Sequence, residues 1–126
     1  MLTLLVLFVA DPTESLRFFT ACGLRFAAEQ HGAGPMHYAA ALPGGLTLEL
    51  YPAGSRPPTR TRLGLTVADA AATLRDLVTA GFAVDCAVAL DPDGNAVELA
   101  GCRCRLQHRL TAGEAEHMIG PAGNLA

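Results

Sequence analysis

A short run of residues near the start of the chain recurs in its second half. Residues 5–11 read Leu-Val-Leu-Phe-Val-Ala-Asp, and residues 63–69 read Leu-Gly-Leu-Thr-Val-Ala-Asp. The offset is 58 residues (69 minus 11). A second match closes each half, where Leu-Glu-Leu at 48–50 returns as Val-Glu-Leu at 97–99. A repeat of this size is larger than one supersecondary element and smaller than a domain, so we expect two related modules that meet around a cavity.

Turn and capping residues divide the first half into a β-α-β-β-β order. Asp11 followed by Pro12 is typical of a helix start, and Glu14 three residues after Asp11 completes a capping box. Gly23 predicts the end of that helix. Apolar and β-branched runs bounded by turn residues predict the strands. The expected strands of this half are residues 3–10, 24–29, 36–42 and 46–51.

The second half has the same plan in fewer residues. Its helix is expected at 70–80, and its strands at 62–68, 82–90 and 96–101. From the helix-capping Asp to the Glu of the closing strand there are 38 residues in the first half (49 minus 11) and 29 in the second (98 minus 69). We therefore expect one hairpin of the second half to be cut short, or two of its strands to be fused.

The length of 126 residues fits a single domain. We expect one domain over 1–126, with a first module at 3–51, a linker at 52–61, a second, shortened module at 62–101 and a C-terminal extension at 102–126. In the extension, residues 102–110 could supply an extra strand. A second capping box predicts a short helix over 112–119.

Charge and composition exclude several function classes. The net charge of −3 argues against a nucleic-acid partner. No apolar run reaches the roughly 20 residues of a membrane span. The apolar start lacks a basic leader, so we expect a cytoplasmic protein whose four cysteines are reduced thiols. All nine basic residues are Arg, which excludes chemistry that needs a Lys.

The alternation of strand side chains predicts which face of the sheet is functional. Alternate residues point to opposite faces, and one face of the opening strands is almost the same in both halves, as expected where each packs on its helix. The other face differs completely, with Leu4, Val6 and Phe8 in the first half and Arg62, Gly64 and Thr66 in the second. Glu49, Tyr51 and Glu98 of the closing strands share this other face. Apolar walls with a few polar groups are typical of small-molecule sites.

The doubled module, the Asp-capped helices and the segment Asp-Pro-Asp-Gly-Asn-Ala-Val-Glu-Leu at 91–99 resemble the vicinal oxygen chelate superfamily. That group includes glyoxalases, bleomycin-resistance proteins and extradiol dioxygenases. The resemblance extends from residue 3 to about residue 101. It implies an α+β fold in which paired βαβββ modules form a curved mixed sheet with helices on one face, the second module being shortened. It also implies a homodimer with ligand sites between the subunits.

The resemblance also indicates where a metal would bind. The ligand positions of metal-dependent members correspond here to Leu4, Glu49, Arg62 and Glu98. Leu4 has no donor atom, and Arg62 carries a permanent positive charge. We therefore expect no metal and no cofactor.

Several side chains are candidates for binding a ligand. They are Phe8, His37, Tyr38, Glu49, Tyr51, Arg62 and Glu98. Glu49 and Glu98 could anchor a ligand or pair with Arg62, and the second interpretation is slightly favoured. His37 and Tyr38 are adjacent on one strand, so one of them must face the cleft. His31, in a turn, is expected to be exposed to solvent.

The function expected from these residues is small-molecule binding without the usual metal chemistry. One alternative is a metal-dependent lyase, isomerase or dioxygenase whose ligands are recruited from elsewhere, such as His37. Another is a non-catalytic interaction or regulatory module. The sequence leaves open whether the protein is an enzyme.

Overall fold

The computed structural model describes residues 1–100. The expectations for the C-terminal extension, namely an extra strand at 102–110 and a helix at 112–119, lie outside the described residues. So do Cys102 and Cys104.

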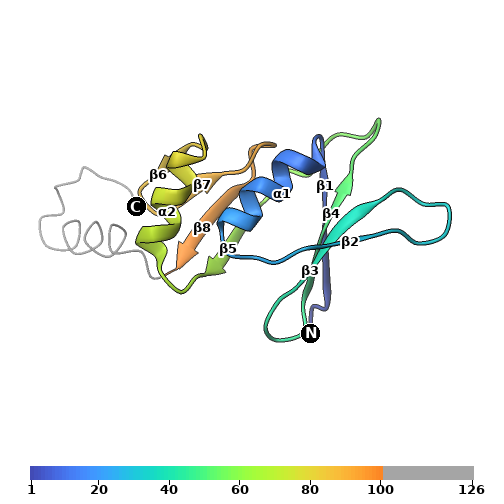
Figure 1. Ribbon diagram of the computed structural model, residues 1–126, viewed down its shortest axis with the longest axis horizontal. Coiled ribbons are helices and arrows are strands. Elements are labelled where there is room, and N and C mark those ends of the chain that lie inside the picture. The colour runs from blue at the N-terminus through green and yellow to red at the C-terminus, as the bar shows by residue number, and fades with distance from the viewer. Residues whose placement is uncertain (101–126) are drawn as a thin grey trace, which may run out of the picture.

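The chain forms two βαβββ modules, as expected (Figure 1). The first contains β1 (Leu4–Val9), α1 (Pro12–Ala21), β2 (Ala27–Glu29), β3 (His37–Ala41) and β4 (Thr47–Pro52). The second contains β5 (Arg62–Thr66), α2 (Ala70–Thr79), β6 (Val84–Asp85), β7 (Val88–Leu90) and β8 (Ala96–Ala100). Each module has its own four-stranded sheet, in the orders β1-β4-β3-β2 and β5-β8-β7-β6. The α+β class and the paired modules are confirmed, but the strands form two sheets rather than one shared sheet.

Equivalent residues cap the two helices. The Asp11 carboxylate accepts hydrogen bonds from the backbone N–H groups of Thr13 (3.1 Å) and Glu14 (3.3 Å). Asp69 accepts one from Ala72 at 3.0 Å. Just beyond each helix, Gly23 and Gly81 have φ angles of 99° and 95°, a left-handed conformation that glycine adopts without a steric penalty. The repeat in the sequence is therefore a repeat in local structure.

The shortening of the second module falls mainly on one hairpin. Residues 30–36 join β2 to β3, whereas residues 86–87 alone join β6 to β7, and β6 and β7 are also shorter than their counterparts. The connections between the last two strands, 42–46 and 91–95, have equal lengths. A hairpin has been cut short and no strand has been lost. The single strand expected at 82–90 is wrong, because this segment turns back on itself.

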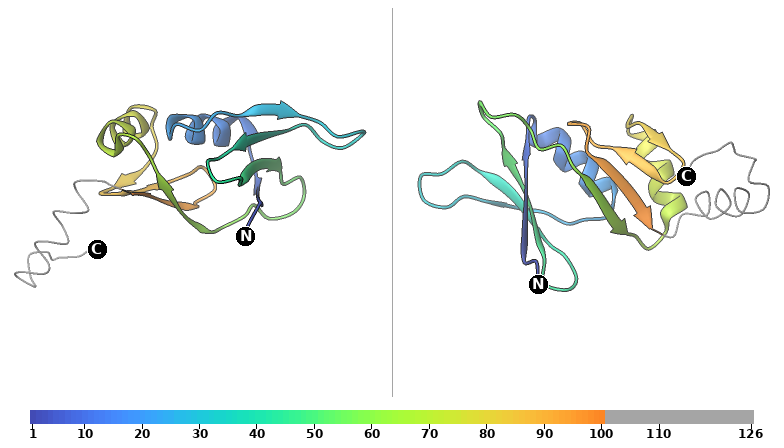
Figure 2. Two further views of the ribbon diagram at one scale, coloured as in Figure 1. Left: turned by 90° about the horizontal axis from the view of Figure 1, so that it is seen from below. Right: turned by 180° about the vertical axis from the view of Figure 1, so that it is seen from behind.

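One core joins the two modules on their helix-bearing side. The buried side chains from β1, α1, β4, α2, β7 and β8 form a single cluster made of Leu7, Val9, Phe18, Phe19, Cys22, Leu48, Leu50, Leu77, Ala89, Val97 and Leu99. The helices α1 and α2 contact each other and lie next to each other on one side of the molecule (Figure 2). The apolar faces of both opening and closing strands point toward them, as the alternation predicts.

Phe18 is at the centre of the junction between the modules. Its ring makes edge contacts with Phe19 at 4.9 Å and with Phe82 of the second module at 5.1 Å between centroids. Arg17 covers the outer side of Phe82 at 4.6 Å and donates a hydrogen bond to the carbonyl of Ala80 at 3.0 Å. The contacts between the modules therefore combine a buried aromatic cluster with an arginine that covers it.

Cys22 is a buried, free thiol in this core. Burial, with a smaller contribution from Asp91, raises its pKa to about 12. Cys86, by contrast, is disulfide-bonded, which corrects the expectation that every cysteine is reduced. Within residues 1–100, neither ten-residue helix has the length and apolar character that a membrane crossing requires.

The turn before β8 is held by a buried polar network. The Asp91 carboxylate accepts hydrogen bonds from the backbone of Asp93 (2.9 Å) and Asn95 (2.8 Å) and from the Asn95 side-chain amide (2.8 Å). The side-chain oxygen of Asn95, Oδ1, accepts a 2.6 Å bond from the backbone N–H of Thr61, just before β5. Asn95 has no exposed surface. The motif that carries the family resemblance thus fixes the start of β8 against the start of β5.

We predict that Asn95→Ala lowers the free energy of unfolding by about 1–3 kcal/mol, because it leaves the Thr61 N–H and one Asp91 oxygen without their partner. Urea denaturation followed by circular dichroism measures this change. Gln30→Ala is the matched control, since that exposed amide makes a single bond, to the carbonyl of Gly34. Equal stability of the two variants would contradict the role given to Asn95.

Candidate functional site

Each sheet has an open face on the side away from its helix. On the first sheet, β1 pairs in parallel with β4, which places Val6 beside Glu49 and Phe8 beside Tyr51. On the second, β5 pairs in parallel with β8, which places Gly64 beside Glu98. The two glutamates therefore occupy equivalent positions on the two open faces.

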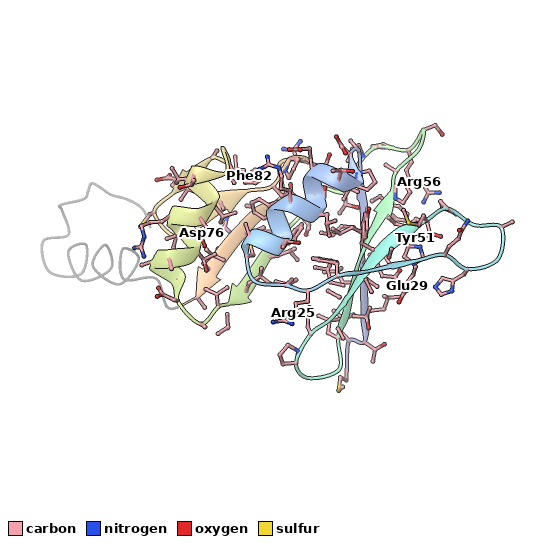
Figure 3. The ribbon with its side chains drawn as sticks, in the orientation of Figure 1. Arg25, Glu29, Tyr51, Arg56, Asp76 and Phe82 are labelled. Atoms are coloured by element: carbon pink, nitrogen blue, oxygen red, sulfur yellow. The ribbon has the colours of Figure 1, made fainter. Side chains whose placement is uncertain are left out.

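The open face of the first module is aromatic at one end. Phe8 and Tyr51 meet edge to face at 6.0 Å, and the His37 ring stacks on Tyr51 at 4.6 Å. The guanidinium of Arg56 lies 4.3 Å from the centre of the Phe8 ring. Tyr51 and Arg56 lie close together on this module, with Glu29 below them (Figure 3). Aromatic rings can stack on a ligand that contains a planar ring system, and an arginine can make a cation–π contact with it.

Of the two adjacent candidates on β3, His37 faces this site and Tyr38 does not. Glu29 pairs with His37 across β2 and β3, so these side chains share the open face. Tyr38 pairs with Leu50, whose side chain is in the core, and it packs against that core. Tyr38 therefore lies on the core side of the sheet, and its role as a ligand contact stays a prediction.

Three side chains at the β2–β3 hairpin form a group that sequence reasoning missed. Glu29, His31 and His37 each place a ligand-type atom within 4.8 Å of the others. The Glu29 Oε1 atom lies 3.4 Å from His37 Nε2 and 3.5 Å from His31 Nε2. Glu49 Oε2 lies 3.8 Å from the same His37 nitrogen. His31 is exposed as expected. Its position in a turn gives no sign in the sequence that it lies near His37, because this proximity depends on how β2 and β3 pair.

His37 is almost completely buried, with 1% of its surface exposed. Its Nδ1 atom lies 3.2 Å from the carbonyl oxygen of Pro35, which fits donation of the Nδ1 proton to that oxygen. Its Nε2 atom is buried and has no hydrogen-bond partner among the described residues. That nitrogen points toward the carboxylates of Glu29 and Glu49.

Arg62 pairs with Glu98, as expected. The Arg62 Nε atom donates to Glu98 Oε2 at 2.5 Å, and Nη2 contacts the same oxygen. The pair spans neighbouring strands of one sheet rather than a cleft between the modules. Glu49, the other partner considered for Arg62, lies instead next to His37. The Arg62 side chain is 64% exposed and that of Glu98 is 22% exposed.

A cavity of 430 Å³ lies on the second module beside this pair. Its lining is mostly apolar and consists of Arg62, Ala83, Val84, Asp85, Val88, Leu90 and Ala96. Leu90 remains 44% exposed, and on the first module Leu4 is 48% exposed. Both open faces therefore present apolar surface to solvent in the single chain.

Two of the four positions at which the family resemblance implies a metal ligand hold Leu4, which has no donor atom, and Arg62, whose guanidinium is bound to Glu98. A cation next to that guanidinium would be repelled. The group around His37 involves only one of the four positions, Glu49.

The sequence pattern of the Glyoxalase/Bleomycin resistance protein/Dioxygenase superfamily matches residues 2–99. The chain belongs to this superfamily. The comparison with curated proteins finds no match.

Solved structures share the fold. One is described as TnmS3, an antibiotic binding protein from Streptomyces sp. CB03234; it is 25% identical, has a TM-score of 0.63, and the match covers 79% of this chain and 93% of that one. Another, a glyoxalase/bleomycin resistance protein from the same organism, is 27% identical and has a TM-score of 0.62; the match covers 79% of this chain and 98% of that chain. A possible glyoxalase from Bacillus cereus is 19% identical and has a TM-score of 0.59; the match covers 79% of this chain and 96% of that chain. At this identity the likeness shows a shared fold only.

We predict a coupling energy below about 1 kcal/mol between Arg62 and Glu98 in the single chain, because water screens a pair whose arginine is largely exposed. A double-mutant cycle of Arg62→Ala and Glu98→Gln, measured by urea denaturation, gives this value. A coupling of several kcal/mol would show that the pair is desolvated in solution, for instance by a second subunit.

Proposed function

We propose that this protein binds an organic small molecule of largely apolar character, with no metal at the superfamily's standard positions. The observation that carries the proposal is the 430 Å³ cavity on the open face of the second module. Its volume lies within the range of roughly 300–1,000 Å³ that is typical of small-molecule pockets.

The lining sets the chemistry of the ligand. Val84, Val88 and Leu90 offer aliphatic surface, while Arg62 and Asp85 supply polar groups at the wall. The Arg62 charge is already balanced by Glu98. A neutral or weakly polar ligand therefore fits better than a strongly anionic one, which would have to compete with Glu98 for the guanidinium.

The description of TnmS3 as an antibiotic binding protein supports the same class of function. At 25% identity that description does not carry a particular ligand to this chain. It favours a binding role over catalysis, as do Leu4 and Arg62 at two of the standard metal positions.

A metal-dependent lyase, isomerase or dioxygenase is the second candidate. The observation that favours it is the group formed by Glu29, His31 and His37, which provides donors away from the standard positions. It ranks second because the described residues that could hold a metal lie on the first module, whereas the cavity lies on the second.

We further propose that the site is completed by a second copy of the chain. The cavity is lined by residues of the second module, and the aromatic face belongs to the first. Pairing the first module of one copy with the second module of another would cover both faces and bury Leu4 and Leu90. This arrangement agrees with the homodimer that the family resemblance implies.

We predict that Tyr51→Ala weakens ligand binding by about tenfold, since in the proposed assembly the aromatic face of one copy closes the cavity of the other, and this substitution removes the central ring of that face. Native mass spectrometry of the purified protein detects any co-purified ligand, and the neutral, apolar dye Nile red is the first compound to titrate. Isothermal titration calorimetry gives the affinity of each variant, because replacing either of the two Tyr residues changes the tyrosine fluorescence itself. Tyr38→Phe is the control, because Tyr38 packs against the core. Equal weakening by both variants would place the ligand elsewhere.

We predict that Leu4→Glu shifts a dimer toward monomer, because it places a charge on the apolar open face of β1. Sedimentation velocity at micromolar concentration measures the shift. Val78→Glu is the control, since Val78 is 58% exposed on α2, away from this face. A wild-type chain that sediments as a monomer would overturn the proposed assembly while leaving the cavity itself to be tested by ligand binding.

A further inference from the structure

We propose that Glu29, His31 and His37 form a binding site for one divalent transition-metal ion, with Glu49 as a fourth donor. Two imidazoles and carboxylates are the donor set that zinc and its neighbours prefer. The site differs from the superfamily's standard positions, with which it shares Glu49 alone. The proposal also departs from the expectation of a protein without a metal, because that expectation was based on the standard positions alone.

Two of the distances between donor atoms fit such an ion. Zinc bonds to nitrogen and oxygen are about 2.1 Å long, so two donors at a tetrahedral ion are about 3.4 Å apart. Glu29 Oε1 lies 3.4 Å from His37 Nε2 and 3.5 Å from His31 Nε2. These separations are too long for good hydrogen bonds and match those of two ligands sharing an ion.

The environment of His37 points to an ion independently of these distances. A proton on Nδ1, donated to the Pro35 carbonyl, leaves the lone pair of the neutral ring on Nε2. That lone pair faces two carboxylates from a buried position and has no hydrogen-bond partner among the described residues. In this tautomer three electron-rich atoms repel one another, and a metal cation between them relieves the repulsion, as a second ring proton also would. Metal-binding histidines also usually donate the proton of their far ring nitrogen to a carbonyl or carboxylate, as His37 does to Pro35.

The hairpin loop holds His31 near the other donors. Within the loop, the Gly34 N–H donates to the His31 carbonyl at 3.0 Å, and the Gln30 amide donates to the Gly34 carbonyl at 2.8 Å. The His31 ring lies 5.2 Å from that of His37. The His31 side chain is 75% exposed, so this donor is directly accessible from solvent. The loop thus provides a ligand at the solvent side of the group.

Isothermal titration of metal-free protein with Zn²⁺, together with native mass spectrometry, tests the proposal. We expect one ion for each chain. His31→Ala and Glu29→Gln should each weaken binding by about tenfold or more, and neither side chain is in the core, so both variants should fold. His37→Gln should abolish binding; if it fails to fold, the other two variants decide.

Two controls separate this site from others. Glu98→Gln should bind zinc like the wild type, because Glu98 is in the other module. Cys102, Cys104 and His108 are further metal-ligand residue types, outside the described residues. A combined Cys102→Ser, Cys104→Ser and His108→Asn variant should also retain the ion. With Co²⁺ the protein should show visible bands of nitrogen and oxygen ligation, without a thiolate charge-transfer band. Zinc binding that is absent, that survives both His31→Ala and Glu29→Gln, or that is lost in the combined variant would overturn the proposal.

Discussion

The packing of both sheets against a shared pair of helices is the constraint on which the rest of the structure depends. Phe18 contacts a ring of each module, and the buried faces of β1, β4 and β8 meet the same cluster. Since strand side chains alternate, burying one face of every strand leaves the polar and aromatic residues on the other. The open faces, and everything proposed for them, are therefore a consequence of where the apolar core lies.

Local patterns in the sequence carry much of this architecture. A helix cap depends on a few neighbouring residues, so the sequence around Asp11 and Asp69 is enough to predict that they cap helices. The glycine that ends each helix can be predicted in the same way. The face on which a residue lies depends on the parity of its position in a strand. This parity alone is enough to predict that Glu49 and Tyr51 lie on the open face, and the family resemblance implies the paired modules.

Features that depend on strand register could not be predicted in the same way. Parity shows that His37 and Tyr38 face opposite sides, but pairing with β2 and β4 decides which of them joins the core. The group around His37 depends on that pairing too, because it brings Glu29 next to His37 from across the hairpin. The division into two sheets also escaped prediction, since a repeat in sequence does not determine whether its copies share hydrogen bonds.

The shortened hairpin explains why the two open faces have different properties. The long β2–β3 connection carries His31 and holds it beside Glu29 and His37, whereas the two residues that join β6 to β7, Cys86 and Ala87, include no histidine. In the second module the corresponding glutamate, Glu98, pairs with Arg62, and the short hairpin borders the cavity. One module thus concentrates donor atoms and the other offers apolar volume. If the first module of one copy packed against the second module of another, the donor atoms of one chain would lie near the cavity of its partner. Among the described residues of the single chain, the donor atoms and the cavity lie on different modules.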